Sequence, residues 1–245
     1  MQPGRATVNI VLFDPGEWTR PLDLDDPRAQ HLLEILKLAP GDRFAAGELG
    51  ARVGTLEFLA KDNGFLRLGN PEWDQVPPPL SRVCLIIGTP RPPTARRLLK
   101  DLTTLGAREL HFAATALGDR SYLQSTLWKG EFHKSLGEGA AQARTTLVPS
   151  VTRHHSLGLA LAAAPGPGVW FDEGGAPWTE HPVHNSAGGG NPLWLALGPE
   201  RGWSDAERAL FQRHGWQKAG LGPRVLRTET ACSLAMGIAV LKGWS

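Results

Sequence analysis

The sequence has few cysteines and no long apolar run, which argues against a disulfide-bonded protein and against a membrane-spanning one. Its 245 residues include two cysteines, Cys84 and Cys232, each inside an apolar stretch. We expect these to be reduced core thiols rather than a redox pair. No apolar run reaches the roughly 18 residues that a membrane-spanning helix needs, and residues 1–5 contain no apolar signal segment. The sequence therefore predicts a cytoplasmic protein without a membrane partner.

Two common kinds of ligand site are also missing. The glycine-rich turns of the C-terminal half match neither G-x-G-x-x-G nor G-x-x-x-x-G-K-[ST], which argues against a dinucleotide site or a P-loop. His181 and His184 stand close together within Gly174–Asn191, a segment rich in glycine, proline and histidine that is typical of a long surface loop. No cysteine or acidic ligand stands at metal-site spacing from them, so we expect no metal.

The net charge of +2 conceals an uneven distribution along the chain. Residues 1–79 carry 8 Lys and Arg against 12 Asp and Glu, residues 80–155 carry 11 against 5, and residues 156–245 carry 7 against 7. The basic excess therefore belongs to the middle segment. Such a segment suits a polyanion such as RNA, or it is simply the solvated face of helices.

A proline run, Val76-Pro77-Pro78-Pro79-Leu80, separates two different sequence patterns and marks a domain boundary. Before it, short alternating segments surround one amphipathic helix, a pattern that predicts a small β-barrel. The strands are expected at Val8–Phe13, Arg43–Ala46, Arg52–Leu59 and Phe65–Gly69, and the helix at Pro27–Leu38.

After the proline run, apolar strands alternate with helices, which predicts an α/β domain with a mostly parallel sheet. The strands are expected at Val83–Gly88, Glu109–Thr115, Gly168–Asp172 and Leu193–Gly198. The helices are expected at Thr94–Gly106, Thr126–Ala143, Ser156–Ala164, Ser204–His214 and Thr228–Leu241. Ser204 and Glu207 fit a capping box at the start of the fourth helix, and Gly215 supplies its stop.

The last predicted helix carries no charge from Ala231 to Leu241. A helix that is apolar on every face must be covered on every face. A second copy of the chain is a suitable cover, so the sequence predicts a homodimer.

Two turns near the C-terminus, at residues 195–204 and 221–231, share the tripeptide Leu-Gly-Pro. Each follows an apolar strand pattern and precedes a helix, and each presents backbone groups rather than bulky side chains to a ligand. Parallel sheets bind ligands at the carboxyl ends of their strands, so we expect both turns to line one pocket. An adenosine-type cofactor such as S-adenosylmethionine fits a pocket of backbone amides and carbonyls without a pyrophosphate site.

The same turns resemble the C-terminal signature of a known family. They contain Leu-Gly-Pro-Glu-x-Gly-Trp-Ser at residues 197–204 and Leu-Gly-Pro-Arg-Val-Leu-Arg-Thr-Glu-Thr-Ala at residues 221–231. This pair is similar to the signature of the RsmE family of SPOUT-superfamily methyltransferases. Residues 139–144 resemble that family's E-A-A-x-Q-x-x-R helix, residues 119–121 its T-E-R-S turn, and residues 31–42 its H-H-L-x-x-V-L-R-L-x-x-G-D element.

The resemblance implies an α/β fold with two domains. Residues 1–76 would form a PUA-like β-barrel that positions RNA, and residues 80–245 a SPOUT α/β domain with a trefoil knot, an exception to unknotted connections. The SPOUT domain would bind the cofactor, carry out catalysis and form the homodimer.

The implied activity is S-adenosylmethionine-dependent methylation of N3 of a uridine in 16S rRNA of the small ribosomal subunit. Two alternatives stay open. One is a SPOUT methyltransferase acting on another RNA or on a ribose hydroxyl, and the other is a non-catalytic RNA-binding protein of ribosome assembly.

By position, the resemblance also implies the residues of the site. The cofactor would be held by Glu173, Leu197, Gly198, Glu200, Gly202, Leu221, Gly222, Leu226 and Thr228. Arg227 would stabilise the uracil anion that forms when N3 loses its proton, and Glu229 would accept that proton. Glu229 has a second interpretation, as an acid that interacts with the dipole of a helix N-terminus.

Contacts to RNA phosphates are expected from the basic middle segment. The candidates are Arg91, Arg96, Arg97, Lys100, Arg120 and Arg144. The chain departs from the family pattern at Arg201, where a second glycine is usual, and at Asp101 and Thr104, where lysine and glutamate are usual. Arg201 either obstructs the cofactor turn or adds a contact to an RNA phosphate.

Overall fold

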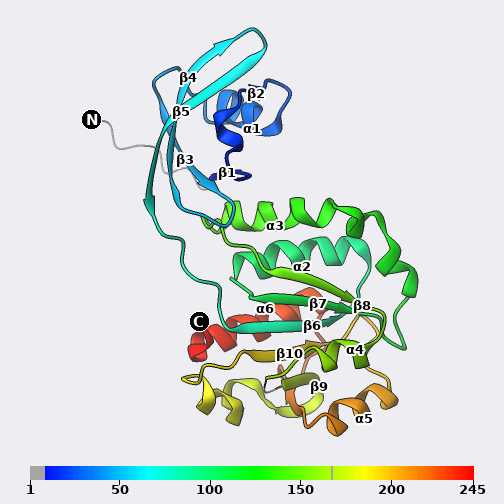
Figure 1. The fold of residues 1–245 in the computed structure, drawn as a ribbon. Helices are drawn as coiled ribbons and strands as arrows, with labels where there is room; N and C mark the ends of the chain where they lie inside the picture. Colours follow the sequence, from blue (N-terminus) through cyan, green and yellow to red (C-terminus); the bar gives the residue numbers. More distant parts are fainter. Residues whose placement is uncertain (1–8, 167) are drawn as a thin grey trace. The chain divides into compact units, whose positions relative to one another are not determined.

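A computed structural model describes residues 9–166 and 168–245, which divide into two compact units (Figure 1). The first unit is the chain up to Pro78 together with Ala140–Leu147, and the second is Pro79–Gly139 with Val148–Ser245. The predicted absence of a signal segment at residues 1–5 and the start of the strand predicted at Val8–Phe13 lie outside the described residues.

The first unit is built on a curled five-stranded sheet in the order β1-β3-β4-β5-β2. The strands are β1 (Val11–Phe13), β2 (Leu22–Asp23), β3 (Arg43–Glu48), β4 (Val53–Asp62) and β5 (Phe65–Gln75). β1 runs parallel to β3, and the other pairs are antiparallel. Register shifts interrupt the pairing of β4 with β5, and such bulges bend and twist a sheet.

The helix of the first unit is shorter than predicted. α1 covers Pro27–Gln30 and continues as a π-helical turn over His31–Ile35, so the helical segment ends before Leu38. Asp26 caps it by accepting a hydrogen bond from the backbone amide of Arg28 at 2.8 Å. Leu32, which is fully buried, packs with the apolar face of the sheet.

The second unit is built on a six-stranded parallel sheet in the order β11-β9-β10-β6-β7-β8. The strands are β6 (Val83–Gly88), β7 (Glu109–Ala113), β8 (Ser150–His154), β9 (Gly168–Pro177), β10 (Leu193–Leu197) and β11 (Gln217–Gly220). The helices are α2 (Pro92–Thr104), α3 (Glu131–Gln142), α4 (Leu157–Ala162), α5 (Asp205–Arg213) and α6 (Thr228–Ala239). The prediction of an α/β unit with a parallel sheet is confirmed.

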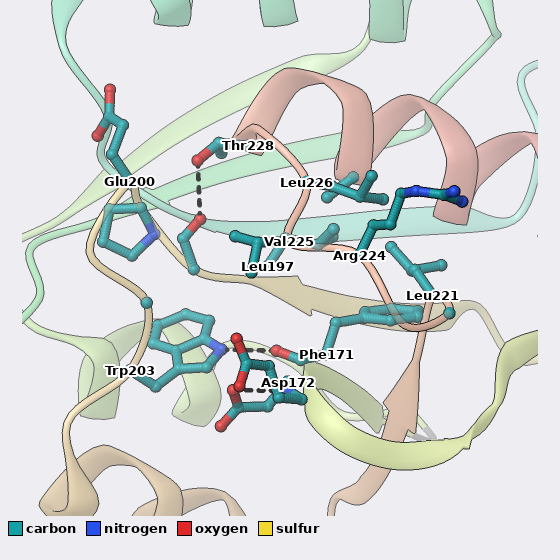
Figure 2. A pocket seen from close by; sticks show the side chains of 16 residues that line it. Phe171, Asp172, Leu197, Glu200, Trp203, Leu221, Arg224, Val225, Leu226 and Thr228 are labelled. Atoms are coloured by element: carbon teal, nitrogen blue, oxygen red, sulfur yellow. Dashed lines mark hydrogen bonds between the residues drawn. The ribbon is translucent and has the colours of Figure 1, made fainter.

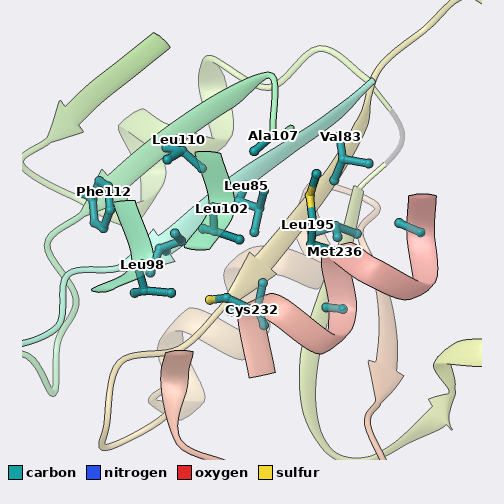
Figure 3. Packing of buried hydrophobic residues seen from close by; sticks show 14 of the residues in the cluster. Val83, Leu85, Leu98, Leu102, Ala107, Leu110, Phe112, Leu195, Cys232 and Met236 are labelled. Carbon is teal, nitrogen blue, oxygen red and sulfur yellow. The ribbon is translucent and has the colours of Figure 1, made fainter. Parts of the chain in front are cut away.

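Helices cover both faces of this sheet, which explains the continuous apolar runs of β6 and β10. Leu85 of β6 and Leu195 of β10 pack with α2 and α6 on one face, and Figure 3 shows this cluster around Leu98, Leu102 and Met236. The next residues along the strands, such as Ile86 and Ala196, pack with α4 and α5 on the other face. Both cysteines are buried and unpaired, and burial raises the pKa of Cys84 to about 12.

Several elements differ from the predictions. β2, β8 and β11 were not predicted, because they are short or lack an apolar alternation. The helix predicted at Thr126–Ala143 is divided at Gly130, whose φ of 128° ends a 3-10 turn before α3 begins.

The prediction of a surface loop at Gly174–Asn191 is wrong over most of its length. β9 continues to Pro177, and two 3-10 helices follow at Trp178–Glu180 and Pro182–Ser186. Trp178 is only 2% exposed, and its indole donates a hydrogen bond to the carbonyl of Ala235 at 2.9 Å. This buried anchor gives the segment a fixed path, and His181 is buried beside it.

The capping box predicted for α5 is confirmed. The Ser204 hydroxyl accepts a hydrogen bond from the Glu207 amide, and the Glu207 carboxylate accepts one from the Ser204 amide at 2.8 Å. Gly215 follows the helix with a positive φ of 71°.

The last helix, which contains most of the uncharged stretch Ala231–Leu241, is covered on one side by its own chain. Cys232, Ala235, Met236 and Ala239 are buried, and a π-helical turn at Val240–Trp244 follows α6. Leu234 is 41% exposed and, beyond the helix, Leu241 is 88% exposed. Among the helices of the described residues, none is long and apolar enough to cross a membrane.

Arg82, just before β6, connects that strand to the C-terminal segment. Its backbone amide donates to the carbonyl of Trp244 at 2.8 Å, and its guanidinium donates to the carbonyls of Gly243, Ala187 and Gly189. Trp244 itself is 1% exposed and belongs to the core.

Candidate functional site

A pocket of about 180 Å³ opens at the carboxyl ends of β10 and β11 and beside a bulge of β9 (Figure 2). At the bulge, Lys218 of β11 pairs with Trp170 and the next residue, Ala219, pairs with Ala176, so residues 171–175 have no partner on β11. The lining residues are Phe171, Asp172, Glu173, Leu197, Gly198, Pro199, Glu200, Gly202, Trp203, Leu221, Gly222, Arg224, Val225, Leu226, Thr228 and Ala231. All nine residues predicted to hold a cofactor are among them.

The first loop follows β10 and folds back tightly on itself. Gly202 has a φ of 69°, and a Cβ on Gly198 would lie 3.1 Å from the Gly202 Cα. Trp203 is buried beneath the loop, and its indole donates a hydrogen bond to the carbonyl of Phe171 at 3.1 Å. Close backbone packing therefore favours glycine at position 198, and the positive φ favours glycine at position 202.

The second loop follows β11 and is tied to the first. The Thr228 hydroxyl donates a hydrogen bond to the Gly198 carbonyl at 3.2 Å, as Figure 2 shows. Gly222 has a φ of 103°. Among the described residues, no acceptor is found for the backbone amides of Gly222 and Leu226, which leaves these donors available to a ligand.

Acidic side chains dominate the charge of the pocket. Asp172 accepts hydrogen bonds from the Arg208 guanidinium at 2.6 Å and from the Glu173 amide at 2.9 Å. The hydrogen bonds from Arg208 to Asp172 and Asp205 raise the pKa of Arg208 above its ordinary value. Glu200 accepts a hydrogen bond from the Arg91 amide at 3.2 Å. Glu173 is exposed at the pocket, so the site suits a ligand that carries positive charge or hydroxyl groups.

The two predicted catalytic residues do not line this pocket. Arg227 is exposed and occupies the N-cap position of α6. Glu229 lies in the first turn of α6, and its carboxylate is 3.8 Å from the guanidinium of Arg97. The arginine that lines the pocket is Arg224, two residues after Gly222.

The predicted RNA-binding residues lie in different surroundings. Arg96 and Lys100 of α2 form ion pairs with Glu131 and Glu138 of α3. Arg120 is exposed beside a separate groove that His155 and Arg213 also line. Arg144 is exposed in the stretch that is grouped with the first unit.

Sequence reasoning missed several lining residues that stand inside or next to the motifs it used. Trp203, Arg224 and Val225 lie within the two Leu-Gly-Pro turns, so the motifs that identified the other lining residues also contain these three. Phe171 and Asp172 lie in the β9 bulge, at the end of the strand predicted at Gly168–Asp172, where only the neighbouring Glu173 was named as a cofactor residue. Across residues 9–166 and 168–245, no group of three or more His, Cys, Asp and Glu side chains could hold a metal.

The sequence of this chain matches known proteins over nearly its whole length. Residues 76–240 match a family described as RNA methyltransferase domain. A ribosomal RNA small subunit methyltransferase E from Treponema pallidum is 33% identical over 94% of this chain and 90% of that protein. The chain belongs to the RsmE family of RNA methyltransferases. An RsmE protein from Borreliella burgdorferi is 27% identical over 96% of this chain and 98% of its own length.

The RsmE fold is also found among solved structures. RsmE from Neisseria gonorrhoeae, determined with S-adenosylmethionine bound, superposes with a TM-score of 0.72 at 18% sequence identity. The match covers 93% of this chain and 95% of that structure. The two chains therefore share a fold across both units.

Proposed function

We propose that this protein is an S-adenosylmethionine-dependent methyltransferase that methylates N3 of a uridine in 16S rRNA of the small ribosomal subunit. Its membership of the RsmE family and the names of its relatives support the reaction class and the substrate. The observation that carries the proposal is the convergence of both Leu-Gly-Pro turns and the β9 bulge on one pocket. An enzyme with this substrate would work in the cytoplasm, where ribosomal subunits are assembled.

The pocket fits the chemistry of the cofactor. Leu197, Leu221 and Leu226 supply an apolar wall for an adenine ring, and the free amides of the second loop supply donors. Glu173 suits the hydroxyls of a ribose, and the acidic lining suits a sulfonium. When bound, S-adenosylmethionine supplies an electrophilic methyl group.

The chain's own task is to free the lone pair of uridine N3, which is protonated at neutral pH. A guanidinium beside the uracil carbonyls stabilises the anion and lowers the pKa of N3. Arg227 is the proposed residue, and Arg224 is a second candidate because it lines the pocket. Glu229 is the proposed proton acceptor, although its contact with Arg97 favours the alternative of a helix-terminus acid.

The finer architecture is part of the same proposal. Residues 1–76 would form a PUA-like barrel that positions RNA, and residues 80–245 a SPOUT domain with a trefoil knot. The strand order supports the knot, since β10 lies between β9 and β6 while Thr228 joins the loops after β10 and β11. Arg91, Arg97, Arg120 and Arg144 would contact phosphates, together with Arg96 and Lys100 where RNA competes with their acidic partners.

The proposal is tested in two steps. Isothermal calorimetry should detect S-adenosylmethionine binding to the purified protein, and absence of binding at high micromolar cofactor would exclude both enzymatic interpretations. Mass spectrometry of 16S rRNA from a deletion strain should then show loss of one uridine-N3 methyl group. If the mark persists, the enzyme acts on another RNA or on a ribose hydroxyl.

A non-catalytic role in ribosome assembly is the alternative from a different class. Arg201 is the feature that favours it, because its side chain stands in the cofactor loop where the family pattern has glycine. Ribosomal-subunit binding without cofactor binding would support this alternative.

A further inference from the structure

A second cavity, of about 470 Å³, adjoins the cofactor pocket across the first loop. The two cavities share Pro199 and Glu200 as lining residues. The rest of the second cavity is formed mainly by Arg91, Gly118, Asp119, Tyr122 and Arg201. A molecule bound here would therefore lie directly beside a cofactor held in the first pocket.

The carboxylates of this second cavity are already engaged by the protein. Asp119 caps the 3-10 helix Arg120–Gln124 by accepting a hydrogen bond from the Ser121 amide at 2.8 Å. Glu200 accepts from the Arg91 amide, and its carboxylate also lies 3.6 Å from the Arg91 side chain. One oxygen of each acid is therefore engaged, and the second oxygen of each stays available as an acceptor.

Arg201 gives the cavity open hydrogen-bond donors. Arg201 is exposed, and within the described part of the chain no carboxylate lies within 4.0 Å of its guanidinium. Its five N–H groups are therefore available to acceptors on a ligand. A cavity with a free guanidinium selects ligands that present carbonyl or phosphate oxygens.

The cavity also offers one aromatic ring. Tyr122 is the only tyrosine of the chain and is half-buried. Its backbone carbonyl accepts a hydrogen bond from the Trp128 indole at 2.8 Å, and its amide donates to the Asp119 carbonyl at 3.1 Å. Because these bonds use the backbone, they position the ring without occupying it. Single-stranded bases stack on aromatic rings held in this way.

We propose that this second cavity binds the unstacked target uracil, with Tyr122 as its stacking platform and Arg201 as donor to a uracil carbonyl. This inference rests on the proposed methyltransferase function. Uracil carries carbonyl acceptors on both sides of N3, whereas cytosine carries an amino donor at position 4. A guanidinium facing that position favours uracil and opposes cytosine, so the cavity is also a specificity site.

The first test separates base binding from cofactor binding. Single-turnover methyl transfer to small ribosomal subunits from the deletion strain is measured for Tyr122→Leu, Tyr122→Phe and Arg201→Ala, with the cofactor Kd measured by calorimetry. We expect Tyr122→Leu and Arg201→Ala to slow transfer by about 10- to 100-fold with cofactor Kd unchanged, and Tyr122→Phe to retain most activity. Arg108→Ala, an exposed charge change just before β7 and outside both cavities, should leave the rate unchanged.

The possible outcomes are distinct. If the unsubstituted protein binds no cofactor or transfers no methyl group, the proposed function fails, and this inference fails with it. If the unsubstituted protein is active and both Tyr122→Leu and Arg201→Ala match its rate, the inference alone is overturned. An equal loss in Arg108→Ala would also overturn it, because the effect of removing Arg201 would then come from net charge alone.

The second test observes the cavity directly. Labelling tyrosine with carbon-13 gives signals from a single residue, so the Tyr122 ring reports on its own contacts. With cofactor bound, uridine 5′-monophosphate should shift these signals at lower concentration than cytidine 5′-monophosphate does. The absence of any shift, or an equal response to both nucleotides, would contradict the assignment.

Discussion

Gly222 gives the second loop of the pocket a backbone conformation that few other residues adopt. Its φ is 103°, yet nothing lies within 4 Å of a Cβ built on it. Gly222→Ala therefore adds backbone strain of about 1–2 kcal/mol without a steric clash. We expect the loop to relax and the affinity for S-adenosylmethionine to fall about 5- to 30-fold in calorimetry.

Gly188→Ala is the matched control for this substitution. A Cβ on Gly188 also meets nothing within 4 Å, but its backbone is not in the left-handed region. The control should bind the cofactor as the unsubstituted protein does. Equal losses in both variants would contradict the role of the Gly222 conformation.

Glu207 joins two segments through one buried carboxylate. It accepts hydrogen bonds from the Ser204 amide and from the Ala116 amide, both at 2.8 Å. Glu207→Ala removes the capping box and leaves the Ala116 amide without its acceptor, so we expect a loss of about 1–3 kcal/mol in the free energy of unfolding. Chemical denaturation measures this loss. Asp205→Ala, in the same helical turn but with an exposed side chain, should change stability far less.

Eight of the nine candidate cofactor residues stand within two short motifs, and all eight line the pocket, whereas Glu173 lies in the β9 segment. Each turn contributes neighbours in sequence, so recognising the motif is enough to name its lining residues. For Arg227 and Glu229 the motif alone is not enough, because the direction of α6 decides which side chains face the pocket. Tyr122 and Arg201 line the same cavity although they are about 80 residues apart in sequence, so no local pattern predicts that they lie together.

At the scale of elements, the strands that sequence patterns predicted best are those buried on both faces. β6 has the predicted bounds, and β10 ends one residue before the predicted bound, because continuous apolar runs are typical of central parallel strands. β8 has an exposed or half-buried pattern, and β11 is four residues long, so neither carries that signal. The path of residues 174–191 depends on one tryptophan in a segment that otherwise has the composition of a loop.

Trp178 should therefore contribute strongly to stability. Its ring packs edge-on against Phe171, and its indole bonds to α6. We expect Trp178→Ala to lower the free energy of unfolding by about 3–5 kcal/mol, and Trp178→Phe to recover part of it. A loss below about 1 kcal/mol for the alanine variant would show that the segment is a loose surface loop after all.

A histidine pair between β7 and β8 should make the sheet sensitive to acid. The His154 Nε2 lies 2.9 Å from the His111 Nδ1, and His111 Nε2 lies 3.1 Å from a Glu109 oxygen. Burial, together with the charges of His111 and His155, lowers the pKa of His154 in the folded state. The unfolded chain therefore binds this proton first, and stability that is present above about pH 6.5 decreases as the pH falls.

The measurement is the Tm at pH 7.5 and at pH 5.5. We expect the unsubstituted protein to lose more Tm on acidification than His154→Asn does. His181 and His184 also have a lowered pKa, chiefly because of burial, so the variant should retain part of the loss. Identical decreases in the two proteins would exclude His154 as a contributor.

For the whole molecule, the exposed apolar side chains of the C-terminal helical segment bear on the proposed homodimer. Leu234 and Leu241 are exposed although the uncharged stretch around them favours burial. We expect Leu234→Asp combined with Leu241→Asp to convert a dimer to a monomer in light scattering. Ile35→Asp, at an exposed leucine-sized side chain of the first unit, should leave the dimer intact.

The contacts of Arg82 show that the second unit folds late, because they join residues at opposite ends of its sequence. β6 pairs with β10 more than 100 residues later, and Arg82, just before β6, bonds to Trp244. While the chain is being synthesised, the middle of this sheet must wait until nearly all of its partners have emerged, whereas every strand pair of the first sheet lies within residues 11–75. Contacts of long sequence separation form slowly. During synthesis on the ribosome, the second unit therefore passes through a prolonged stage in which α2 and β7 have emerged but their later partners have not. Chaperones would protect the apolar surface that is exposed at this stage.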